Sequence, residues 1–115
     1  MESRKYRQPP KNYPREVWLG HRRYLIHYVP PTHPAVIDAD KSELLGCVEC
    51  RTGDIYCNIN QQRSSLKDTV IHEMCHILYE YAPLPEDEEM EENVVKFCTA
   101  LILELEAAGV LKVRF

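Results

Sequence analysis

The chain has 115 residues, enough for one compact domain and too few for two. Its composition, 44% hydrophobic and 28% charged, is that of a globular protein, and no apolar run reaches the roughly 18 residues of a membrane-spanning helix. A net charge of −4 argues against nucleic acid as the main partner. Five cysteines and a polar N-terminus without an apolar h-region predict a reduced, cytoplasmic protein rather than a secreted disulfide scaffold.

The basic residues gather near the N-terminus, where residues 1–23 carry seven Lys or Arg against two Glu. We therefore expect a basic, partly disordered arm over residues 1–22 and a single domain over residues 23–115. A sharper alternative is that the arm contacts an acidic partner, nucleic acid included.

The first half of the domain has the pattern of strands. Residues 23–29 alternate between apolar and polar side chains and end at a proline pair, and the proline-rich residues 30–43 predict a loop or a short helical turn. Residues 44–50 and 54–60 predict two further strands, joined by a turn in which Gly53 can take a positive φ.

The second half has helical spacing. Ser65 to Asp68 resembles a capping box, and apolar residues recur at helical intervals over residues 66–81. Asp87 can cap a second helix that stops at Gly109, and the tail 110–115 is β-prone and could add a short strand. The expected fold is α+β, with a small antiparallel sheet of about three strands packed on an antiparallel helical hairpin.

The first predicted helix contains the motif H-E-x-x-H at residues 72–76. Histidines four positions apart lie one above the other on a helix, so His72 and His76 can bind one metal ion, while Glu73 can take a proton from water activated by that metal. The simpler interpretation is that two histidines lie on the solvated face of an amphipathic helix.

A catalytic zinc site needs a third protein ligand, and no histidine follows His76. On a helical wheel Glu91 lies about 75° from the centre of the apolar face of the second helix, whereas Glu88, Glu89 and Glu92 lie about 125–175° away, toward solvent. Antiparallel packing would also bring Glu91 level with His76. We therefore predict Glu91 as the third ligand.

With these residues the chain resembles the zinc-dependent H-E-x-x-H metallopeptidases of the glutamate-ligand (gluzincin-like) type, and among them the ImmA/IrrE-like and small phage-type domains. The resemblance covers roughly residues 44–105 and includes TVIHEMCHILYEY and EENVVKFCTALILEL. It implies that His72, His76 and Glu91 bind zinc and that Glu73 is the general base. The family often has Asp or Asn four residues after the ligand glutamate, to orient a histidine, and here that position is Val95.

Three further roles are open from the residues alone. Asp68, Glu80 or a backbone carbonyl could orient a zinc-bound histidine in place of the missing acid. Four side chains could stabilise the oxyanion of a peptidase reaction, namely Tyr79, Tyr56, His33 and Arg63. An exposed sheet edge at residues 54–60 could hold an extended peptide by strand addition.

The remaining cysteines and histidines favour structural roles. Cys47 and Cys50 form a C-x-x-C with Cys57 beyond it, which could be a zinc knuckle or a redox pair; residues three apart on a strand face opposite ways, so packing is the preferred interpretation. Packing is also preferred for Cys75 and Cys98, and His21, His27 and His33 show no ligand spacing.

The leading functional prediction is a zinc metallopeptidase that cleaves a protein or peptide, such as a regulatory protein. Two alternatives are a non-catalytic protein-binding module with a peptidase-like fold and a protein that binds nucleic acid through its basic arm. The sequence leaves open the substrate, the oligomeric state and the choice of zinc over Fe, Mn or Ni.

Overall fold

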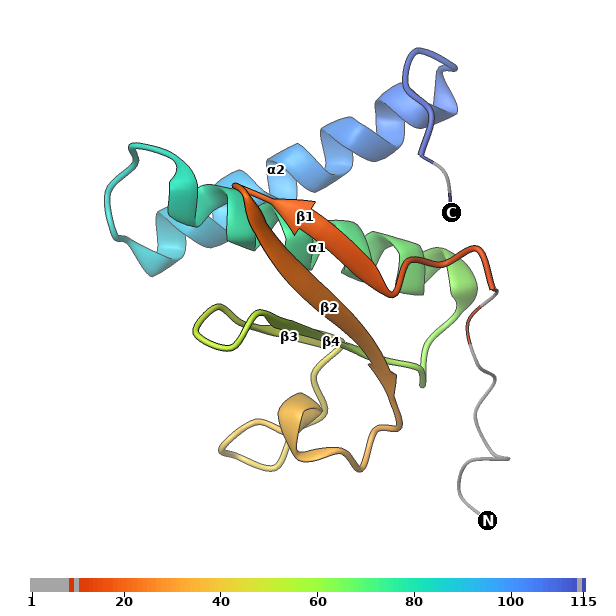
Figure 1. The fold of residues 1–115 in the computed structure, drawn as a ribbon, viewed down its shortest axis with the longest axis vertical. Coiled ribbons are helices and arrows are strands. Elements are labelled where there is room, and N and C mark those ends of the chain that lie inside the picture. Colours follow the sequence, from red (N-terminus) through yellow and green to blue (C-terminus); the bar gives the residue numbers. More distant parts are fainter. Residues whose placement is uncertain (1–8, 10, 114) are drawn as a thin grey trace.

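A computed structural model describes residues 9, 11–113 and 115, and shows an α+β fold (Figure 1). In chain order its elements are β1 (Glu16–Leu19), β2 (Arg22–Val29), the short 3-10 helix η2 (Pro34–Val36), β3 (Gly46–Glu49), β4 (Asp54–Asn58), α1 (Arg63–Tyr81) and α2 (Glu88–Ala107). Helix α1 packs on the sheet, and α2 packs on α1. No helix among these residues is long and apolar enough to cross a membrane.

The sheet has four strands in the order β1-β2-β4-β3 and is mixed. Strands β1 and β2 pair antiparallel, and so do β3 and β4. Strands β2 and β4 are parallel neighbours, and residues 30–45 connect the end of β2 to the start of β3. The expected sheet of about three antiparallel strands therefore differs from the observed sheet in the number of strands and in the direction of one pairing. Strand β4 is internal, so the expected free edge at residues 54–60 is wrong, and the edges are β1 and β3.

The extra strand comes from the segment expected to be an arm. Strand β1 pairs with β2 through a tight turn in which Gly20 and His21 both have positive φ, and Tyr13 is buried in the core. Ordered structure thus begins well before residue 23. Residues 1–8 and 10 of the expected arm lie outside the described residues.

Both helices lie close to their expected positions, and the start of α1 differs from the expected one. Helix α1 begins at Arg63 after Gln62, so the expected capping box at Ser65 is not its cap; Ser65 Oγ instead donates to Gln61 Oε1. Asp87 caps α2 as expected, because its carboxylate accepts a hydrogen bond from Met90 N. Neither Val110–Val113 nor Phe115 forms the strand expected in the tail; Phe115 packs on the ring of Tyr13.

The core has two parts, one on each side of α1. Between the sheet and α1 lie the buried side chains of Tyr24, Ile26, Ile55, Leu66, Val70 and Ile77. Between α1 and α2 lies a smaller cluster of Ile71, Cys75, Tyr79 and Val95. Helix α1 is therefore the central element, and its remaining face is free to carry polar side chains.

Candidate metal centre

The H-E-x-x-H motif lies in the middle of α1. His72 and His76 point to the same side of the helix, and their side chains are only 24% and 16% exposed. The two Nε2 atoms face one another at 3.2 Å. The imidazoles are therefore not on a solvated helix face, which was the simpler interpretation of this motif.

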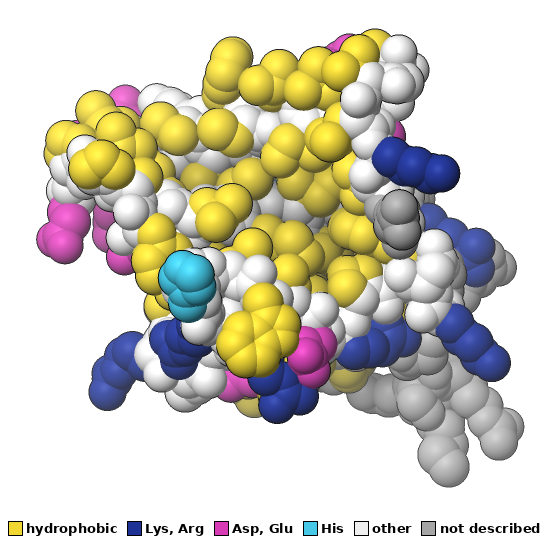
Figure 2. Space-filling view, turned by 45° about the horizontal axis from the view of Figure 1, so that its top comes forward, with side chains coloured by type: hydrophobic (Ala, Val, Ile, Leu, Met, Phe, Trp, Pro, Cys, Tyr) yellow, Lys and Arg dark blue, Asp and Glu magenta, His cyan; other side chains and the backbone are white. Residues whose placement is uncertain are grey.

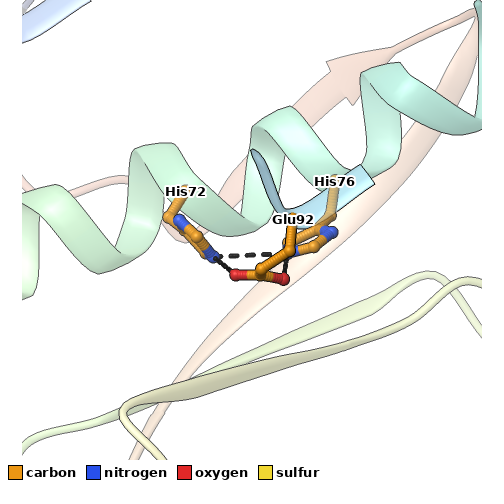
Figure 3. A group of neighbouring side chains, drawn as sticks. All are labelled: His72, His76 and Glu92. Atoms are coloured by element: carbon orange, nitrogen blue, oxygen red, sulfur yellow. Dashed lines mark hydrogen bonds and ion pairs between the residues drawn. The ribbon is translucent and has the colours of Figure 1, made fainter. Parts of the chain in front are cut away.

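The carboxylate that completes the group comes from Glu92 of α2 (Figure 3). Its Oε1 lies 3.1 Å from His72 Nε2 and its Oε2 lies 3.2 Å from His76 Nε2. Helix α2 packs on α1 through Val95 and Thr99, its two buried residues. Because Glu92 is three and seven positions before these residues, it shares their face and points at the histidines.

The spacing of these donor atoms suits a tetrahedral metal ion. In a zinc site with bonds of 2.0–2.1 Å, neighbouring ligand atoms lie about 3.3 Å apart. The distances of 3.1–3.2 Å among the two Nε2 atoms and the Glu92 oxygens are close to that value. Two imidazoles and one carboxylate are also a donor set that zinc accepts, with a fourth position left for water.

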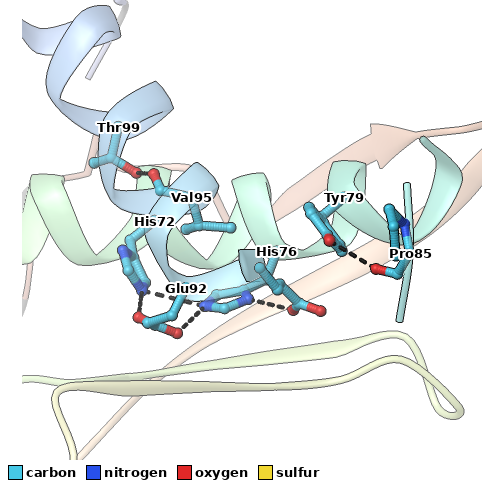
Figure 4. A network of polar contacts seen from close by, with 8 residues as sticks. His72, His76, Tyr79, Pro85, Glu92, Val95 and Thr99 are labelled. Carbon is cyan, nitrogen blue, oxygen red and sulfur yellow. Dashed lines mark hydrogen bonds and ion pairs between the residues drawn. The ribbon is translucent and has the colours of Figure 1, made fainter. Parts of the chain in front are cut away.

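Glu91 lies on the other side of the His76 ring. Its Oε2 is 2.6 Å from His76 Nδ1, the nitrogen that faces away from His72. Figure 4 shows His72 and Glu92 together on the opposite side of the His76 ring. If Nδ1–H donates to this carboxylate, Nε2 keeps a lone pair that faces the centre of the group. The structure thus places Glu92, not the expected Glu91, beside both Nε2 atoms, and it places the Glu91 carboxylate beside His76 Nδ1.

Glu73 lies under strand β3. Its side chain is 7% exposed, and burial raises its pKa to about 7, an effect strengthened by Glu92 and opposed by His76. Burial also lowers the pKa of His72, as does its neighbour His76. No hydrogen bond or ion pair joins Glu73 to another described residue, so its carboxylate is available for proton transfer.

A cleft of about 560 Å³ opens in front of these residues. His72, Glu73, His76 and Glu92 form one wall, and residues 44–48, leading into and along edge strand β3, form the other. Gly46 makes the approach of α1 to β3 possible, because a Cβ there would lie 2.7 Å from Thr69 Cγ2. The cleft therefore lies between the group of His72, His76 and Glu92 and the edge strand β3.

None of the four expected oxyanion donors lines this cleft. Tyr79 donates its hydroxyl to Pro85 O on another side of α1, and His33 packs against Tyr56. Likewise, no hydrogen bond of the described residues joins Asp68 or Glu80 to a motif histidine. The carboxylate that contacts His76 Nδ1 is instead that of Glu91.

The other cysteines and histidines have structural surroundings. Cys57 is fully buried, and burial raises its pKa to about 12; burial also raises the pKa of Cys47 and Cys50, which disfavours thiolate chemistry. His27 is 2.7 Å from Asp54 Oδ1, and His33 Nδ1 accepts a hydrogen bond from Ala35 N. Among the described residues, only His72, His76 and Glu92 form a group that could hold a metal ion.

Comparison with known proteins gives no relative: no protein-family model, curated protein or solved structure matches this chain.

Proposed function

We propose that this protein is a zinc-dependent hydrolase that cleaves peptide bonds. The observation that carries the proposal is the triangle of His72 Nε2, His76 Nε2 and the Glu92 carboxylate, with the buried carboxyl of Glu73 beside it in one cleft. When bound, zinc lowers the pKa of water to about 7 and polarises a carbonyl group. The resemblance of the motif to gluzincin-like peptidases supports the same reaction class.

Each acidic residue then has a distinct task. Glu92 and the two imidazoles hold the ion, and Glu91 keeps His76 in the tautomer that presents Nε2. Glu73 accepts the proton of the attacking water and delivers it to the leaving amine.

The free edge of β3 supports an extended peptide as substrate. Asn58 N donates to Leu45 O directly before the first pair of the β3–β4 ladder, so its register continues to Leu45 and Asn58 at a hydrogen-bonded position. In an antiparallel ladder bonded and non-bonded pairs alternate, which directs the backbone groups of Gly46 and Val48 toward the free edge. A peptide that adds a strand there would pass in front of the metal-binding group.

The test is to measure zinc by plasma mass spectrometry in protein purified without chelators, and hydrolysis with fluorescein-labelled casein and a quenched fluorescent peptide library. We expect one zinc per chain, and a loss of about 10²–10⁴-fold in hydrolysis for Glu73→Gln with zinc retained. Glu92→Gln should lose zinc, whereas Glu89→Gln, a change at an exposed neighbour, should retain zinc and hydrolysis. Wild-type protein without zinc, or Glu73→Gln with full activity, would refute the proposal.

One observation favours a second function, a binding module whose metal is structural. None of the four expected oxyanion donors lines the cleft, and such a donor is a component of many hydrolytic sites. Stoichiometric zinc with no hydrolysis of either probe, together with unfolding at lower temperature after zinc removal, would assign this function instead.

A further inference from the structure

Helix α2 leaves its most apolar face uncovered. Val95 and Thr99 are its buried residues, while Met90, Phe97 and Leu101 are 40%, 68% and 45% exposed. Among the described elements, α2 makes its contacts with α1. These three side chains form an apolar stripe on a 20-residue helix, and the described part of the chain covers the stripe only in part.

Leu101 of this stripe, with Val94, Cys98 and Ile102, forms one wall of an apolar groove of about 420 Å³ between the two helices. Residues of α1 and the following turn, including Leu78 and Leu84, form the other wall, and both side chains are more than 40% exposed. Figure 2 shows hydrophobic side chains gathered over and between the helices on this face. The groove is separated from the metal-binding group by the buried contact of α1 with α2.

One end of the groove is strongly acidic. Tyr79 and Leu84 line both the groove and a neighbouring cavity whose walls carry five acids: Glu80, Glu86, Asp87, Glu88 and Glu91. The first four of these are exposed, and they make no ion pair with any described residue. The groove thus combines an apolar floor with uncompensated negative charge at the end where α1 leads to α2.

We propose that this groove binds a basic amphipathic helix of a partner protein. An amphipathic helix inserts its apolar face into such a groove, and lysines or arginines at its end would meet the acidic residues. A second copy of the chain fits less well, because α2 carries six glutamates against one lysine and two such helices would repel each other. This inference concerns a different surface from the cleft and does not depend on zinc.

Two synthetic 18-residue helical peptides test the proposal. Both carry leucine at positions i, i+3, i+4 and i+7; one has lysine and the other glutamate at the remaining positions. A third peptide scrambles the lysine sequence. Fluorescence anisotropy should show that the lysine peptide binds the full-length protein at least about tenfold more tightly than either other peptide. Equal binding of all three, or no binding, would overturn the proposal.

Matched variants locate the binding surface. Leu101→Gln, in the groove, should weaken binding of the lysine peptide about tenfold. Leu111→Gln, of similar exposure but outside the groove, should not. Glu86→Gln with Glu88→Gln should weaken binding and reduce its salt dependence, whereas the same changes at Glu43 and Glu49 should leave both unchanged.

Equal effects of the two leucine variants would refute the assignment of this surface. Sedimentation analysis covers the alternative occupant. A dimer that Leu101→Gln dissociates would assign the groove to a second copy and overturn the proposal.

Discussion

The contact between β3 and α1 at Gly46 gives a sharp test of how the cleft is built. A Cβ on Gly46 would lie 2.7 Å from Thr69 Cγ2 and 3.2 Å from Glu73 Cγ. Carbon atoms pack best at about 3.5–4.0 Å, so the strand or the threonine must move by about 1 Å. Thr69 cannot rotate freely, because its hydroxyl bonds both Gln61 Oε1 and Ser65 O. We expect Gly46→Ala to lower the free energy of unfolding by about 1–3 kcal/mol.

A double-mutant cycle measures the cause of that loss. Thr69→Ser removes the clashing methyl and keeps the hydroxyl, so it should restore part of the stability of Gly46→Ala. Urea denaturation followed by circular dichroism gives the four free energies, and the double variant should be more stable than the sum of the single changes by about 0.5–3 kcal/mol. Additive changes, or a Gly46→Ala protein with the wild-type urea midpoint, would refute this account of the packing.

Three further predictions follow from other contacts. Ile77→Ala, at a fully buried position between α1 and the sheet, should cost about 2–5 kcal/mol by urea denaturation, and a loss below 1 kcal/mol would contradict the described core. The hydrogen bond from His27 lowers the pKa of Asp54, so its stabilisation is present above the unfolded pKa and is lost as pH falls through the folded pKa; Asp54→Asn should flatten the loss of thermal stability in acid, and an unchanged profile would contradict this. Glu91→Gln should weaken zinc binding about 10–100-fold in a competition titration with a chromogenic chelator, and an unchanged affinity would show that Glu91 does not orient His76.

The local elements were readable from the sequence because their signals are local. The proline breaks, the acidic cap at Asp87 and the 3.6-residue spacing depend on neighbours in the chain, and they gave α1, α2 and the strands β2, β3 and β4. The parallel pairing of β2 with β4 depends on how residues 30–45 cross the sheet, which alternation does not encode. Strand β1 was not predicted, because the lysines and arginines around it favoured the interpretation of residues 1–22 as a basic arm.

Glu92 lies beside the two histidines where Glu91 was expected, and the difference has a specific physical reason. The helical wheel assumed that α2 packs through the centre of its apolar face, which would turn Glu92 to solvent. In the structure α2 packs through Val95 and Thr99, which turns Glu92 toward the histidines and leaves Phe97 exposed. The choice of packed face depends on long-range contacts and on whatever else covers the helix, and neither is visible in the spacing of one segment.

The most direct test of the metal centre is a crystal structure of the protein with one equivalent of zinc, with anomalous data collected at the zinc edge. The account predicts one strong peak within about 2.0–2.2 Å of His72 Nε2, His76 Nε2 and a Glu92 oxygen, with Glu91 still on His76 Nδ1. A peak coordinated by Glu91 in place of Glu92, or zinc bound elsewhere with both imidazoles free, would contradict it.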